Sequence, residues 1–127
     1  MQCTWVGMPV SDIDTFAIAA AELNAEVNQV HLTSCGEDVL DTQPNDRWQT
    51  ILAGDIFYER DTAARAFAFM ADYASAGATI LIGDPGRTFL PKAKLVRLAD
   101  YRVPVTRDLE DAEIKHTAVW TISPDSL

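Results

Sequence analysis

The run Thr79-Ile-Leu-Ile-Gly83 restricts the fold more than any other stretch of this 127-residue chain. It is continuously apolar, and glycines flank it at Gly77 and Gly83. Such a run is typical of a strand that is buried on both faces, which occurs in parallel sheets covered by helices. We therefore expect strands and helices to alternate along the chain, as they do in α/β proteins.

The remainder of the chain fits this alternation. Helical spacing of apolar residues predicts three helices, over Thr15 to about Asn28, 62–76 and Pro91 to about Asp100. Asp14 or Thr15 suits the cap of the first helix, and Asp61 suits that of the second. Short apolar or alternating runs predict further strands at 5–11, 30–33, 50–53, 103–106 and 115–122. The expected fold is α/β, Rossmann-like, with a mostly parallel sheet and a C-terminal antiparallel strand pair.

Length and composition set the class of protein. A chain of this length is expected to form a single domain over residues 1–127, and a hydrophobic content of 48% argues against disorder. No apolar run approaches the roughly 20 residues of a membrane helix, and the N-terminus lacks a secretory pattern. We therefore expect a cytoplasmic protein that is not bound to a membrane, with Cys3 and Cys35 as reduced thiols.

The net charge of −9 is unevenly distributed. Residues 1–61 contain eleven acidic and two basic residues, whereas residues 62–127 contain eight of each. Clustered Lys and Arg are needed to bind a phosphate backbone, so a nucleic-acid partner is not expected. An acidic rim would favour a cationic substrate, although a merely soluble acidic surface explains the same composition.

Carboxylates follow three of the predicted strands, and ligands of open α/β sheets bind beyond the carboxyl ends of strands. Asp12 suits hydrogen bonds from ribose hydroxyls, and Asp38 suits an exocyclic amine such as that of adenine. Asp55 comes directly after Gly54 and suits an amine or ammonium, with Tyr58 three residues later. The alternative is that these acids cap local loops and that Tyr58 covers a sheet edge.

The turn Asp84-Pro-Gly-Arg87 follows the fourth strand. Arg87 would pair with Asp84 or with an acid of a substrate, and a purely structural turn is an equal alternative. The sequence contains no zinc-ligand spacing, no G-x-S-x-G nucleophile elbow and no P-loop, so no metal is expected.

Together these motifs resemble the class I (seven-strand) S-adenosylmethionine-dependent methyltransferases. The similarity is greatest to the lysine methyltransferases of the electron transfer flavoprotein β subunit and to predicted nicotinamide N-methylases. It runs from about Val10 to Ile122. The segments that carry it are Ser11-Asp-Ile-Asp14, Gly36-Glu-Asp38, Leu52-Ala-Gly-Asp-Ile-Phe-Tyr-Glu59, Ile82-Gly-Asp-Pro-Gly-Arg87 and Thr117-Ala-Val-Trp-Thr121.

The resemblance implies an enzyme that transfers a methyl group from S-adenosyl-L-methionine to a protein lysine, with the flavoprotein β subunit as a possible substrate. By position it assigns Asp12 to the cosubstrate ribose, with Ile13 also binding the cosubstrate, Glu37 and Asp38 to adenine, and Ala53 and Gly54 to the methionine moiety. It assigns Asp55 and Tyr58, the D-x-x-Y motif, to the target lysine. The last two are the expected catalytic residues.

The sequence departs from the family pattern at its beginning. The family opens with a strand, a helix and a G-x-G-x-G turn, and residues 1–9 are too few to hold them. We therefore expect an N-terminally truncated methyltransferase fold that lacks the first strand and helix. Exposed sheet edges then favour association of copies of the chain. Two alternatives stay open, namely a non-catalytic remnant acting as an interaction module and an N-methyltransferase of a small amine such as nicotinamide.

Overall fold

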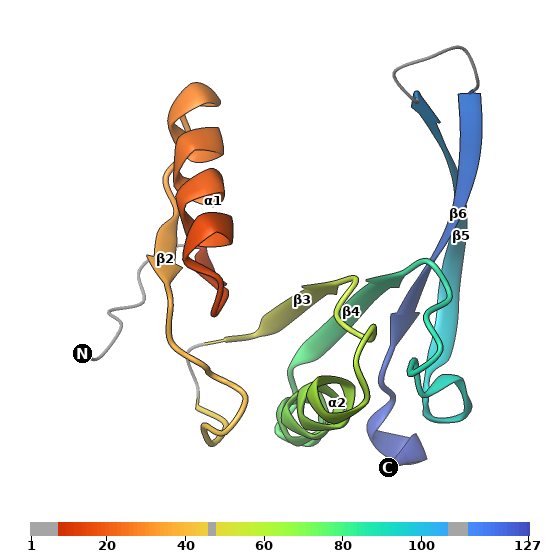
Figure 1. Cartoon of the computed structure of the whole chain (residues 1–127). Helices are drawn as coiled ribbons and strands as arrows, with labels where there is room; N and C mark the ends of the chain where they lie inside the picture. The colour runs from red at the N-terminus through yellow and green to blue at the C-terminus, as the bar shows by residue number, and fades with distance from the viewer. Residues whose placement is uncertain (1–7, 46–47, 107–111) are drawn as a thin grey trace. The chain divides into compact units, whose positions relative to one another are not determined.

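The computed structural model describes residues 8–45, 48–106 and 112–127. Its elements, in chain order, are β1 (Pro9–Ser11), α1 (Thr15–Val27), β2 (Thr33–Cys35), β3 (Thr50–Gly54), α2 (Arg60–Ser75), β4 (Thr79–Asp84), the 3-10 turn η1 (Lys92–Lys94), β5 (Val96–Thr106), β6 (Ala112–Thr121) and the 3-10 turn η2 (Pro124–Ser126) (Figure 1). The chain divides into two compact units, Met1–Asp41 and Thr42–Leu127. The expectation of a single domain over 1–127 stays a prediction.

The first unit is a β-α-β arrangement in which β1 and β2 pair in parallel and α1 connects them. Pro9 opens β1, a position where the missing N–H costs little. Asp14 caps α1 as predicted, because its side chain accepts a hydrogen bond from the N–H of Phe16 at 2.8 Å. The parallel pairing, from Pro9↔Thr33 to Ser11↔Cys35, places the carboxyl ends of β1 and β2 at the same edge.

The predicted strand at 30–33 is displaced toward the C-terminus, since β2 begins at Thr33. After α1, Gln29 adopts a left-handed φ of 56° and the N–H of Val30 bonds to the carbonyl of Ala25. This turn includes Val30, the first residue that the apolar pattern assigned to the strand. Cys35, which ends β2, is buried and disulfide-bonded, so the expectation of a reduced thiol is wrong for this residue.

The second unit contains a four-stranded sheet in the order β3-β4-β6-β5. β3 and β4 are parallel, whereas β6 is antiparallel to both β4 and β5. The predicted C-terminal antiparallel pair is therefore confirmed, and β5, an edge strand, accommodates Pro104. Figure 1 shows this pair as a long hairpin that projects beyond β3 and β4.

Helix α2 packs against β4 and forms the core of the second unit. Its buried face includes Phe69, Met70 and Tyr73, and the facing sheet contributes Ile80 and Ile82. The helix ends as predicted at Gly77, whose φ of 99° is left-handed. The predicted cap is wrong: Glu59 is the N-cap residue, and Asp61 lies inside the first turn, where its charge favours the positive end of the helix dipole.

The predicted helix from Pro91 to Asp100 is also wrong. Pro91 precedes only the single 3-10 turn η1, and the chain is extended from Val96 onward. The segment has helical spacing, but β5 pairs with β6 from Val96↔Thr121 to Thr106↔Ala112. This long-range pairing outweighs the weak local preference for a helix.

One edge of β3 is open among the described residues, where β3 pairs only with β4. The carbonyl of Gln49 accepts from Thr79, and the N–H of Asp55 donates to Gly83, so alternate residues between them also face β4. The backbone groups of Thr50, Leu52 and Gly54 consequently point away from the sheet. Leu52 is 68% exposed, and β3 itself contains no charged residue and no proline that would protect this edge.

Candidate functional site

The parallel strands β3 and β4 end side by side, and each is followed by or ends in a carboxylate. Gly54 of β3 is in register with Gly83 of β4, so Asp55 and Asp84 follow two neighbouring glycines. A Cβ added at either glycine would meet no atom within 4 Å. At the carboxyl ends of β3 and β4, Gly54 and Gly83 therefore leave the backbone uncovered by side chains, next to Asp55 and Asp84.

Asp84 organises the turn that follows β4. Its carboxylate is 1% exposed, and its Oδ1 accepts hydrogen bonds from the N–H groups of Gly86 and Arg87, both at 2.7 Å. Gly86 provides the left-handed φ of 97° that lets the chain reverse here. The turn is therefore fixed by a buried side chain, and it places Arg87 at the carboxyl end of β4.

Asp55 is held by its backbone in an unusual conformation. Its N–H donates to the carbonyl of Gly83 at 2.9 Å, and its φ is 51°. The left-handed region is unfavourable for residues with a Cβ, although Asp tolerates it better than most. Strain of this kind is common where a side chain must be aimed for function.

Arg87 and Asp55 form a bidentate ion pair between the ends of β4 and β3. Arg87 Nε lies 2.7 Å from Asp55 Oδ1, and Arg87 Nη2 lies 2.8 Å from Oδ2. Sequence reasoning offered Asp84 or a substrate acid as the partner of the Arg87 side chain, and the structure shows Asp55 instead. Both side chains stay about half exposed, at 46% for Arg87 and 49% for Asp55.

The ion pair stabilises the charged form of both groups. The hydrogen bonds from Arg87 lower the pKa of Asp55, burial opposes this, and the charges of Arg87 and Lys115 lower it further. The hydrogen bonds to Asp55 raise the pKa of Arg87 in turn. Asp55 is consequently a carboxylate at neutral pH and a poor acceptor of protons.

Tyr58 lies on the loop between β3 and α2 and is 63% exposed. Its neighbour Phe57 is completely buried and anchors that loop to the core. Within the described residues the carboxylate of Asp55 bonds to Arg87 rather than to the Tyr58 phenol. Tyr58 is therefore a phenol presented to the surroundings by a fixed loop.

The predicted acids of the first unit lie together at the carboxyl ends of β1 and β2. The N–H of Asp12 donates to Cys35 at 3.1 Å, and Ser11 Oγ donates to the carbonyl of Glu37 at 3.1 Å. Asp12 Oδ1 accepts from Asp14 N–H, and Asp38 Oδ1 accepts from Leu40 N–H. These local bonds fix carboxylates that stay exposed.

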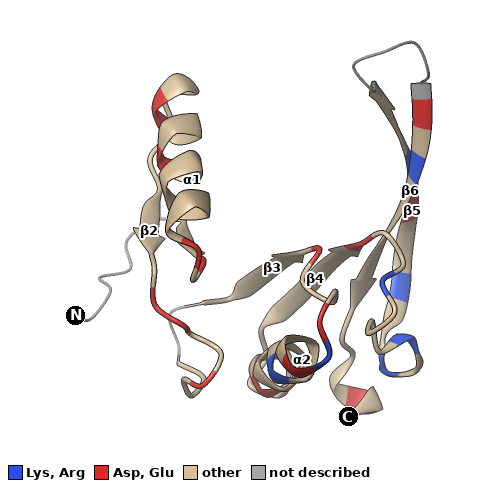
Figure 2. Ribbon diagram, viewed as in Figure 1, with Lys and Arg blue, Asp and Glu red and all other residues tan. Residues whose placement is uncertain are grey.

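The other two predicted binding residues have simple surroundings. Ile13, between Asp12 and the cap of α1, is 72% exposed. Ala53 is the last residue of β3 before Gly54 and is partly buried. Figure 2 shows acidic segments in the loops after β2 and β3 and at the end of β4, and basic segments in η1 and along β5 and β6.

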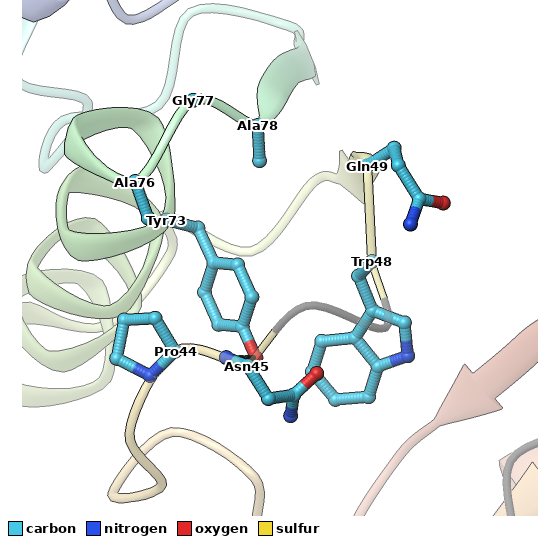
Figure 3. A pocket seen from close by; sticks show the side chains of 8 residues that line it. All are labelled: Pro44, Asn45, Trp48, Gln49, Tyr73, Ala76, Gly77 and Ala78. Atoms are coloured by element: carbon cyan, nitrogen blue, oxygen red, sulfur yellow. Dashed lines mark hydrogen bonds between the residues drawn. The ribbon is translucent and has the colours of Figure 1, made fainter.

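Two cavities lie at opposite ends of the sheet in the second unit. The smaller, of about 80 Å³, lies beside Asp84, and its lining includes Arg97, His116 and Trp120. The larger, of about 260 Å³, lies where β3 and β4 begin. Figure 3 shows Tyr73 of α2 reaching toward Asn45, whose backbone N–H donates to the Tyr73 hydroxyl at 3.3 Å.

The larger cavity is aromatic rather than acidic. The rings of Trp48 and Tyr73 stack at 5.5 Å in its wall, and burial raises the pKa of the Tyr73 phenol. None of the residues predicted for binding or catalysis lines it. The groups with reactive or charge-pairing chemistry lie instead beyond the carboxyl ends of the strands, as expected for an open α/β sheet.

No helix among the described residues is long and apolar enough to cross a membrane.

Comparison with curated proteins confirms the predicted resemblance. The chain is 31% identical over 115 residues to the electron transfer flavoprotein beta subunit lysine methyltransferase of Danio rerio, covering 87% of this chain and 45% of the relative. The Mus musculus protein of the same name is 30% identical over 120 residues, covering 90% and 47%. The chain thus spans about half the length of the curated relatives it matches. No family model matches the sequence.

Comparison with solved structures confirms the fold class. N-methyltransferase NodS of Bradyrhizobium japonicum, in complex with S-adenosyl-L-homocysteine, superposes with a TM-score of 0.59 at 16% identity, over 90% of this chain and 65% of that one. An rRNA methylase of Streptococcus thermophilus superposes with a TM-score of 0.54 at 9% identity, over 91% and 72%. The chain has the Rossmann-like α/β fold of the methyltransferases.

Proposed function

We propose that this chain is part of an S-adenosylmethionine-dependent N-methyltransferase whose acceptor is a lysine of a protein, with the electron transfer flavoprotein β subunit as the first candidate. The observation that carries the proposal is the pair of exposed, ionised and strand-anchored groups at the ends of β3 and β4, Asp55 and Arg87. The similarity to the lysine methyltransferases of fish and mouse supports the same reaction and the same class of acceptor.

The residues of the chain fit the proposed cosubstrate. Exposed carboxylates at the ends of β1 and β2, on Asp12 and Asp38 with Glu37 beside it, have the chemistry to accept hydrogen bonds from ribose hydroxyls and an adenine amine. Gly54 with Ala53 offers a bare backbone edge for the methionine part. When bound, S-adenosylmethionine supplies an electrophilic methyl group, so the protein mainly provides proximity and orientation.

The acceptor side of the proposed site consists of Asp55 and Tyr58. Asp55 holds the acceptor nitrogen through a carboxylate whose direction is fixed by its backbone, and its lowered pKa excludes it as the base. The proton of the acceptor lysine therefore passes to water. Tyr58 shapes the approach of the lysine side chain from the anchored loop.

The substitution Asp55→Asn tests the proposal. We expect methyl transfer to the flavoprotein β subunit to fall on the order of 100-fold, because the acceptor nitrogen loses its anchor. Affinity for S-adenosylhomocysteine, measured by calorimetry, should stay within about threefold. Asp72→Asn, an exposed acid on α2, is the matched control and should leave both quantities unchanged.

Three results would contradict parts of the proposal. An equal loss of cosubstrate binding and turnover in Asp55→Asn would move Asp55 to the cosubstrate side. No heat with S-adenosylhomocysteine at high concentration would favour a non-catalytic remnant. Transfer to nicotinamide but not to the protein would favour a small-amine enzyme.

The open edge of β3 also supports association of copies of the chain, for which a strictly monomeric mass by light scattering would be the contrary result.

A further inference from the structure

Arg87 already occupies the carboxylate that the proposed function assigns to the acceptor nitrogen. Its guanidinium bonds to one oxygen of Asp55 at 2.7 Å and to the other at 2.8 Å. A carboxylate has about four acceptor positions, so each oxygen keeps capacity for a further donor. With Asp55 about half exposed, an approaching amine can reach that capacity without displacing Arg87.

The pair is built into the fold rather than formed by two flexible surface chains. The backbone of Arg87 is fixed by the buried carboxylate of Asp84, and the backbone of Asp55 is fixed by its hydrogen bond to Gly83. Exposed ion pairs normally gain little because both side chains must be ordered. Here two strand ends already hold both backbones, and the bidentate geometry fixes the direction of the carboxylate.

We propose that Arg87 is a positioning residue that makes the site select the neutral form of the acceptor amine. An unpaired carboxylate would bind a lysine most strongly as the ammonium, which has no lone pair to attack a methyl group. With its charge balanced by Arg87, Asp55 can still accept an N–H of the neutral amine but attracts the ammonium less. This inference rests on the proposed function and gives a reason for the ion pair between Arg87 and Asp55.

The charges around the pair act in the same direction. Lys115 of β6 lies close enough to lower the pKa of Asp55, and its positive charge also disfavours an ammonium nearby. Asp84 is the opposing acid, and its charge raises the pKa of Arg87. Because Arg87 is bonded directly to Asp55, removing its charge is the change expected to matter most to the acceptor nitrogen.

The test is the pH dependence of methyl transfer by the wild type, Arg87→Gln and Arg87→Lys. Arg87→Gln leaves the charge of Asp55 unbalanced, so the acceptor should lose its proton only at higher pH. We expect the midpoint of the rate profile to rise by about one pH unit and the rate near neutrality to fall about tenfold, with recovery at alkaline pH. Arg87→Lys retains a charge and should keep the midpoint close to that of the wild type. Arg102→Gln on β5 makes the same change in net charge and should leave the profile in place.

The possible outcomes separate the inference from the function on which it rests. A loss in Arg87→Gln that is the same at every pH, or a profile that does not move, would overturn the inference and leave the methyltransferase proposal standing. A wild-type chain that transfers no methyl group at any pH would overturn the proposed function, and the inference would fall with it. Calorimetry with S-adenosylhomocysteine should give the same affinity for Arg87→Gln as for the wild type.

Discussion

Carboxylates that follow parallel strands are used differently in the two units of this chain. In the first unit, Asp12 and Asp38 each accept a hydrogen bond from the N–H two residues farther along the same loop. In the second unit, Asp55 bonds to a side chain 32 positions away, and Asp84 fixes the turn that presents this partner. Asp12 and Asp38 therefore support their own loops, as Asp84 supports its turn, whereas Asp55 links two strand ends.

Among the substitutions that test this contrast, Asp84→Ala should have the largest effect on the free energy of unfolding. Two backbone N–H groups, of Gly86 and Arg87, lose a charged acceptor whose side chain is buried, so the free energy of unfolding should fall by about 2–3 kcal/mol. Asp38→Ala removes the acceptor of the Leu40 N–H in an exposed loop and should cost less than about 1 kcal/mol. Urea unfolding measures both, and equal losses would show that the two kinds of carboxylate do not differ.

A pair of substitutions at Asp55 isolates the cost of its backbone conformation. Both Asp55→Ala and Asp55→Gly remove the ion pair, but only glycine adopts a φ of 51° without strain. We expect the glycine variant to be more stable than the alanine variant by about 1 kcal/mol in urea unfolding. At Asp12, whose φ is not positive, the order should reverse. An alanine variant as stable as the glycine variant at position 55 would remove the argument for strain.

The smallest expected effect is the loss of folding stability at acidic pH. The pKa of Asp55 is lowered in the folded chain, so its ion pair contributes stability above the unfolded pKa of about 3.9 and loses it as the pH falls through the folded value. Because the pair is half exposed, the contribution should be below about 1 kcal/mol. Unfolding curves of the wild type and Arg87→Gln should differ at pH 7, and the difference should shrink only as the pH falls below the unfolded pKa of Asp55 and through its lower folded pKa. A difference that persists at pH 2 would assign it to packing rather than to charge.

The order of helices and strands was predictable wherever the signal was local. Asp14 caps α1 through its own loop, Gly77 ends α2, and the apolar run forms β4, all of which follow from adjacent residues. The expectation that this strand is buried on both faces is wrong, because its buried residues alternate with exposed or half-buried ones. The predicted helix after Pro91 failed because β5 is stabilised by pairing with β6, which no short window reveals. Long-range pairing is the term that propensity omits.

The candidate site, too, was predictable from the sequence only in part. The positions of Asp12, Asp38 and Asp55 after strands were readable, because ligands of open α/β sheets bind beyond the carboxyl ends of strands and carboxylates there are recognisable in the sequence. The partner of Asp55 was not readable, since Arg87 had a nearer acid, Asp84, in its own motif. The structure shows why Asp84 is not that partner, since its Oδ1 accepts the backbone N–H groups of Gly86 and Arg87.

The left-handed backbone at Asp55 also limits which amino acids that position can use. Glycine, asparagine and aspartate are the residues that enter this region most easily. Of these three, only aspartate carries the negative charge that the Arg87 guanidinium meets. Glutamate would keep the charge but would not tolerate this backbone conformation. Asparagine would tolerate the conformation but would lose the charge. Two independent physical demands, one on the backbone and one on the side chain, therefore leave a single amino acid that satisfies both.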